Sequence, residues 1–84
     1  MQFKANVKVM LKPSVLDPQG ATLERALKSM GHDNVSSIRV GKLIELVLES
    51  ESAQEATKAA NDWADQLLAN PNMENYSLTL EQLS

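Results

Sequence analysis

The sequence predicts an α+β domain in which two helices cover one face of a four-stranded antiparallel sheet. Three observations predict it. The chain begins with a long run of strict apolar and polar alternation, it contains two segments with helical spacing, and each of these segments follows a helix-capping residue. The 84 residues are enough for one small domain, so we expect a single domain over residues 1–84.

The first predicted element is a half-buried strand over residues 2–12. Its apolar positions alternate with polar ones and are Phe3, Ala5, Val7, Val9 and Leu11. Pro13 ends the run. Asp17 is then a good N-cap with Pro18 at the first helical position, and Gly31 is a stop signal, which predicts a helix over residues 18–30.

The middle of the chain predicts a hairpin. Val35, Ile38 and Val40 indicate one strand, Gly41-Lys42 fits a two-residue turn, and residues 43–49 indicate the next strand. On that predicted hairpin tip, Arg39 and Lys42 are expected to be solvated, so that removing both charges leaves folding intact.

The remaining elements complete the predicted order. Ser52 and Glu55 form the capping box S-x-x-E ahead of a second helix, which stops at Asn70-Pro71, and residues 76–81 alternate as a last strand. The order β-α-β-β-α-β predicts a ferredoxin-like fold. We expect the three aromatic residues, Phe3, Trp63 and Tyr76, in or beside the core.

Charge argues against two classes of partner. The net charge of −3 makes general binding to nucleic acid or to an anionic membrane surface a poor hypothesis, and no run of apolar residues reaches the length of a membrane span. With no cysteine and no leader-like N-terminus, we expect a cytoplasmic protein. Residues 1–42 carry +4 and residues 43–84 carry −7, which indicates either pairing across strands or a bipolar surface between partners.

No group of residues predicts catalysis. His32 is the single histidine, no cysteine is present, and the three glycines are too far apart for a phosphate-binding loop, so we assign no catalytic, cofactor-binding or metal-binding residue. Glu45 and Glu49 share a strand face. They are expected to pair with Lys4, Lys8 or Lys12 on the neighbouring strand rather than to act as an acid-base pair.

One sheet face and two loops remain as surfaces for partners. On the face away from the helices, Met10, Leu43 and Val47 are predicted as a dimer interface. The loops are residues 12–20 and 39–42. Gly20 lies in the first turn of a helix, where a side chain is missing so that a backbone can approach closely. That backbone belongs either to a partner or to a neighbouring loop of the same chain.

Two motifs carry a resemblance to a known family. The stretch Leu16-Asp17-Pro18-Gln19-Gly20 combined with Arg39-Val40-Gly41-Lys42 at this spacing resembles the PurS family, the small subunit of formylglycinamidine ribonucleotide (FGAM) synthase. The similarity extends over nearly the whole chain, including Leu67-Leu68-Ala69-Asn70-Pro71.

The resemblance implies a non-catalytic subunit of purine biosynthesis. It joins a glutaminase subunit (PurQ) to a synthetase subunit (PurL) and supports the transfer of ammonia, as a homodimer or a larger homo-oligomer. ATP, Mg and glutamine are then used by the partner subunits. The implied partner-binding residues are Leu16, Asp17, Pro18, Gln19, Gly20, Arg39, Gly41 and Lys42.

Two other functions are open at this level. A regulatory domain that binds a small molecule as a dimer is compatible with the same predicted fold. An acylphosphatase-like enzyme is a weaker hypothesis, because that chemistry needs an arginine in the loop after the first strand, and residues 12–20 contain none.

Overall fold

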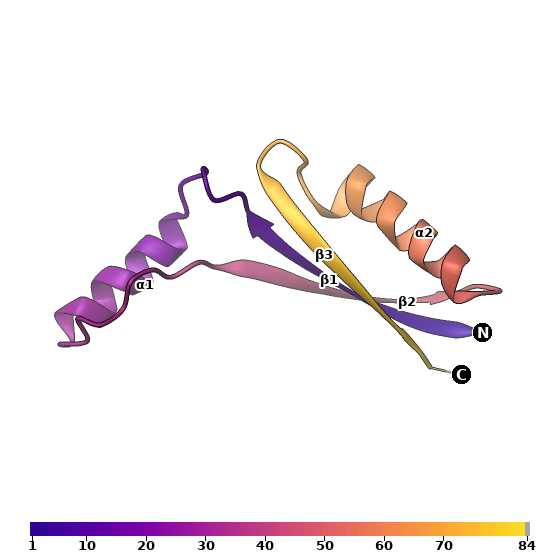
Figure 1. Ribbon diagram of the computed structural model, residues 1–84, viewed down its shortest axis with the longest axis horizontal. Helices are drawn as coiled ribbons and strands as arrows, with labels where there is room; N and C mark the ends of the chain where they lie inside the picture. Colours follow the sequence, from indigo (N-terminus) through magenta and orange to yellow (C-terminus); the bar gives the residue numbers. More distant parts are fainter. Residues whose placement is uncertain (84) are drawn as a thin grey trace.

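The computed structural model describes residues 1–83 and has an elongated α+β fold (Figure 1). Its elements are β1 (Gln2–Leu11), α1 (Pro18–Ser29), β2 (Gly41–Glu49), α2 (Ala53–Trp63), the π-helical turn η1 (Ala64–Leu68) and β3 (Glu74–Gln82). The strands form one antiparallel sheet in the order β2-β1-β3.

The prediction of a four-stranded ferredoxin-like sheet is wrong, because residues 35–40 form no strand and no hairpin. Gly41 begins β2 instead of turning the chain. A two-residue turn with glycine at its first central position needs a positive φ there. Within residues 1–83 a positive φ occurs at Gly31 and not at Gly41. The chain therefore runs straight from residue 38 into β2, and the segment before it lies along α1 (Figure 1).

The core lies between the sheet and α2. The side chains of Phe3, Val7 and Val9 point from β1 to the helix side and are no more than 1% exposed. Ala56 and Ala60 of α2 are fully buried in one cluster with Phe3, and their small size lets the helix lie close to the sheet. Both α2 and its Ser52 N-cap were correctly predicted: the Ser52 hydroxyl accepts a hydrogen bond from the Glu55 amide at 3.1 Å.

Trp63 departs from the expected core position. Its side chain is 43% exposed, whereas Phe3 is buried and Tyr76 is half-buried. The expected ion pairs are found in part. Lys4 pairs with Glu45 at 3.7 Å across the two strands, while Glu49 pairs with the amino terminus at 2.7 Å rather than with a lysine.

Helix α1 has the predicted ends but an unexpected place. Asp17 caps it, and Gly31, at φ +93°, ends it with a bond from the His32 amide to the Leu27 carbonyl at 3.0 Å. The helix does not cover the sheet. It lies beyond one end of β1, and α2 covers the sheet toward the other end (Figure 1).

The result is an extended molecule with two regions. Its Cα radius of gyration is 16.6 Å, against about 12 Å for a compact chain of this length. We call residues 13–40 the arm and residues 1–12 with 41–83 the body. No helix in the described part of the chain has both the length and the apolar character that a membrane span requires.

Candidate functional site

The two sequence motifs meet where the arm joins the body. Residues 16–20 form the loop and first turn that start α1, and residues 39–42 form the link from the arm into β2. They are separated by the whole of α1 in sequence, yet their backbones lie side by side. The structure thus brings together the two motifs that the sequence singled out, although at an arm joint instead of a hairpin tip.

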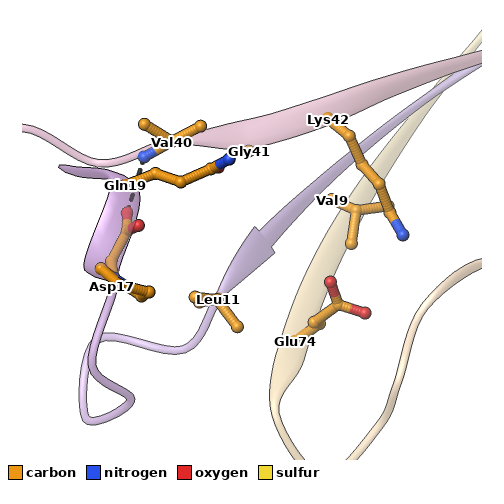
Figure 2. A pocket seen from close by; sticks show the side chains of 9 residues that line it. Val9, Leu11, Asp17, Gln19, Val40, Gly41, Lys42 and Glu74 are labelled. Carbon is orange, nitrogen blue, oxygen red and sulfur yellow. Dashed lines mark hydrogen bonds between the residues drawn. The ribbon is translucent and has the colours of Figure 1, made fainter.

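Asp17 connects the two motifs directly. One carboxylate oxygen accepts the Gly20 amide at 3.0 Å, which caps α1, and the other accepts the Val40 amide at 2.7 Å (Figure 2). The residue is buried at 7% exposure. Hydrogen bonds from the Gly20 and Val40 amides lower the pKa of Asp17 below its ordinary value of 3.8, and Arg39 nearby adds to this effect. Asp17 is therefore a fixed anion that ties helix to link, not a proton donor.

Arg39 forms a second bond across the joint. Its guanidinium donates to the carbonyl oxygens of Leu11 at 3.1 Å and of Lys12 at 3.0 Å, at the end of β1. Its Nε lies 3.9 Å from the Asp17 carboxylate. The expected hairpin tip is absent, but Arg39 is exposed, and its guanidinium is bonded to the backbone. Its side chain fixes the direction in which the arm leaves the body.

The two motif glycines allow close backbone approach. A Cβ on Gly20 would overlap the carbonyl oxygen of Ile38, and a Cβ on Gly41 would overlap the Met10 side chain and crowd the Val9 carbonyl oxygen. The close neighbour of Gly20 is thus a segment of the same chain, so the glycine has an internal role in seating α1 against the link.

A hollow of about 310 Å³ lies beside this joint on the helix side of the sheet. Its apolar lining includes Val9, Leu11 and Val40. Figure 2 shows the Lys42 ammonium and the Glu74 carboxylate directed into the same space. Glu74 also accepts the Asn70 amide at 2.7 Å, so it is held by the loop before β3. The hollow has opposite charges on its wall but no nucleophile beside a base.

The other predicted residues lie on open surfaces. Leu16 is 79% exposed at the start of the arm, and Pro18 and Gln19 are exposed on the first turn of α1. Met10, Leu43 and Val47 lie on the sheet face away from α2 and are 38%, 56% and 59% exposed. Within residues 1–83 there is no group of three or more His, Cys, Asp or Glu side chains arranged to hold a metal ion.

Sequence reasoning missed the residues that complete the joint. These are Ile38 and Val40, which offer backbone groups, and Glu74, which belongs to the last strand. Every residue type has a backbone carbonyl, and all but proline have a backbone N–H. The residue types at positions 38 and 40 therefore gave no indication that Ile38 and Val40 take part in the joint. Glu74 could have been noticed in the sequence, because it is a charged residue in phase with the apolar residues Tyr76, Leu78 and Leu80 of the last strand.

The comparisons with known proteins decide the family. The family model described as "PurS: Phosphoribosylformylglycinamidine (FGAM) synthase" matches residues 4–82. The chain belongs to the PurS family. It is 41% identical over 81 residues to a phosphoribosylformylglycinamidine synthase subunit PurS from Synechocystis, covering 96% of this chain and 81% of that one, and 38% identical to the Bacillus subtilis subunit, covering 96% and 95%.

Solved PurS structures share this fold. The Thermus thermophilus PurS structure matches at a TM-score of 0.87 and 41% identity over 100% of both chains. A chain in the structure of PurLQS from Thermotoga maritima matches at a TM-score of 0.88 and 32% identity, covering 96% of this chain and 99% of that one. The comparisons therefore support the subunit hypothesis over the regulatory-domain and acylphosphatase-like alternatives, and they agree with an α+β fold.

Proposed function

We propose that this chain is the PurS subunit of FGAM synthase and that it supplies contact surfaces, while the reacting groups come from its partners. Membership of the PurS family over residues 4–82 carries the proposal. The polar groups of the motif joint support it as well. The Asp17 carboxylate and the Arg39 guanidinium are both engaged in bonds within the chain, so neither is free to act on a substrate.

The partners in this proposal are a glutaminase subunit, PurQ, and a synthetase subunit, PurL. A PurLQS complex of Thermotoga maritima contains a chain similar to this one, which supports the assignment. PurS joins the two so that ammonia passes from one to the other, and glutamine, ATP and Mg are used by the partners. The chain acts in the cytoplasm as a homo-oligomer and holds no cofactor of its own.

The surface offered to PurQ and PurL includes the exposed part of the motif segments. Leu16, Pro18 and Gln19 project from the arm, and Lys42 points into the hollow beside it. The shape of this surface is fixed by the residues of the joint beneath it, which are Asp17, Gly20, Arg39 and Gly41. The division is testable, because changes to the first group leave the fold intact and changes to the second group do not.

A reconstitution with purified PurL and PurQ tests the function. Adding this chain restores glutamine-dependent formation of FGAM, because PurQ and PurL are then joined. Ammonia-dependent turnover by PurL alone needs it much less. Leu16→Glu is the matched surface variant. It leaves the melting temperature unchanged and weakens glutamine-dependent turnover. If ammonia-dependent turnover requires the chain to the same degree, the joining role is wrong.

A further inference from the structure

The helix side of the sheet is apolar along most of its length, but two opposite charges stand in its apolar rows at one end. Lys42 pairs with Val9 of β1 and is in phase with the apolar residues of β2. Glu74 pairs with Leu11 of β1 and is in phase with the apolar residues of β3. Such rows normally carry the side chains that face a core. The two charges therefore mark this end of the sheet as chemically different from the rest.

Neither charge is fully satisfied within the chain. In the part of the chain that the structure describes, the Lys42 ammonium has no hydrogen bond and no ion pair. The Glu74 carboxylate accepts the Asn70 amide at 2.7 Å through one oxygen, which leaves the other oxygen open to a ligand. Strands β2 and β3 flank β1, so their backbones are about 10 Å apart. A small molecule with one charge of each sign can lie between the two side chains.

The space between these charges is the hollow beside the joint (Figure 2). Its volume of about 310 Å³ is at the lower end of the range for small-molecule sites. Val9, Leu11 and Val40 give it an apolar lining. Asp17 also lines it, but both of its carboxylate oxygens are already bonded to backbone amides. The charges that remain for a ligand are one cation and one anion.

We propose that this hollow binds a zwitterionic α-amino acid. The ligand carboxylate accepts hydrogen bonds from the Lys42 ammonium, and the ligand ammonium donates to the free oxygen of Glu74. The aliphatic part of the ligand lies against the apolar lining. Because the site faces solvent, we expect a dissociation constant on the order of 1 mM. All of these groups belong to one chain, so the inference goes beyond the joining role and does not depend on PurQ or PurL.

A titration with three related molecules tests whether both charges of the ligand are needed. The probe is L-leucine, and its analogues are 4-methylpentanoate, which lacks the ammonium group, and 3-methylbutylamine, which lacks the carboxylate. Amide resonances of residues 9–11, 41–43 and 74–75 report binding to the full chain. We expect L-leucine to shift them, and each analogue to bind about tenfold more weakly or worse, because one protein charge is then left unpaired.

Charge variants test whether Lys42 and Glu74 supply the two contacts. Lys42→Gln and Glu74→Gln should each raise the dissociation constant for L-leucine by about tenfold. The glutamine at position 74 keeps an oxygen for the Asn70 amide. Lys8→Gln and Glu81→Gln remove the same charges from the opposite face of the sheet, so each should change it by less than about twofold.

A double variant, Lys42→Glu with Glu74→Lys, adds a test that lost folding cannot imitate. The zwitterion can reverse its direction, so binding should return to within about threefold of the wild type. Three results would overturn the proposal. One is equal binding of L-leucine and 4-methylpentanoate. Another is L-leucine binding that neither single variant weakens. The third is no shift of these amides at about 20 mM L-leucine, well above the expected dissociation constant.

Discussion

The body and the arm are built by different forces. In the body, apolar side chains from β1 and α2 fill a core in which Phe3, Val7, Ala56 and Ala60 are at most 1% exposed. In the arm, the buried residues are Asp17 and Gly20, and the large apolar residues Leu16, Leu23 and Met30 are exposed. The body is held together by hydrophobic burial, and the arm is held in place by hydrogen bonds at its root.

This difference in stabilising forces explains why the body forms a core and the arm keeps a fixed direction. Hydrophobic contacts are not directional, so they stabilise a core without fixing the angle of an outlying element. Charge-assisted hydrogen bonds are directional. The bonds of Asp17 and Arg39 therefore set the angle of the arm, while its apolar residues Leu23 and Met30 stay exposed.

The largest effect should come from the body. Phe3→Ala removes the largest fully buried side chain and lowers the free energy of unfolding by about 3–5 kcal/mol. Leu23→Ala on the arm costs less than about 1 kcal/mol when measured at a dilution where the chain is monomeric, because little of that side chain is buried within the chain. Urea denaturation of both variants checks the contrast. Equal losses would mean that the arm has a core of its own.

The next effect concerns Gly20. Gly20→Ala places a methyl group on the Ile38 carbonyl, which is backbone and cannot rotate away, so α1 must separate from the link. We expect a loss of about 2–3 kcal/mol. Gln19→Ala, one residue earlier and exposed, is the control and changes stability by less than about 0.5 kcal/mol. A stable Gly20→Ala variant would show that the joint tolerates a shift.

Arg39 and Lys42 should behave differently from one another, although both are cations in one motif. Arg39→Ala loses two bonds to carbonyl oxygens and costs about 1–2 kcal/mol. Lys42→Ala removes a charge that lines the hollow and costs at most about 0.5 kcal/mol. Thermal melting of the two single variants measures this. Identical melting temperatures would mean that Arg39, like Lys42, contributes only a solvated surface charge.

The smallest effect depends on pH. Because the pKa of Asp17 is lower in the folded chain than its ordinary value of 3.8, its stabilising contribution is fully present above that value. It is lost as pH falls through the lowered pKa. Asp17→Asn should therefore melt below the wild type by about 5 °C at neutral pH, and the gap should narrow in acid. A gap that stays constant from about pH 6 to pH 2 would contradict the charged role of Asp17.

Local chemistry in the sequence predicted the individual elements well. The alternation from Phe3 to Leu11, the Asp17 and Ser52 caps and the Gly31 stop are all features of neighbouring residues, and each is confirmed. The hairpin failed because Gly41 is compatible with two outcomes. A glycine can turn the chain, or it can admit a close neighbour, and here it admits Met10 and the Val9 carbonyl.

The candidate site was predictable as a set of residues and not as a geometry. Asp17, Gly20, Arg39 and Gly41 were identified from motif spacing, but their roles depend on backbone groups of Ile38, Val40, Leu11 and Lys12. Every residue has those backbone groups, so the sequence cannot mark which of them are used. The prediction for Trp63 failed because the place of a side chain round α2 relative to the sheet depends on how the helix packs, and this side chain is 43% exposed.

Amide hydrogen exchange over a series of protein concentrations tests the contrast between body and arm most directly. The account predicts that the amides of β1 stay protected at every concentration at which the chain is folded. Those of α1, residues 18–29, are less protected than those of β1 at the lowest concentrations, where the chain is monomeric, because few apolar side chains of the arm are buried within the chain. Equal protection of α1 and β1 across the whole series would contradict the account, since the arm would then be stable without any partner.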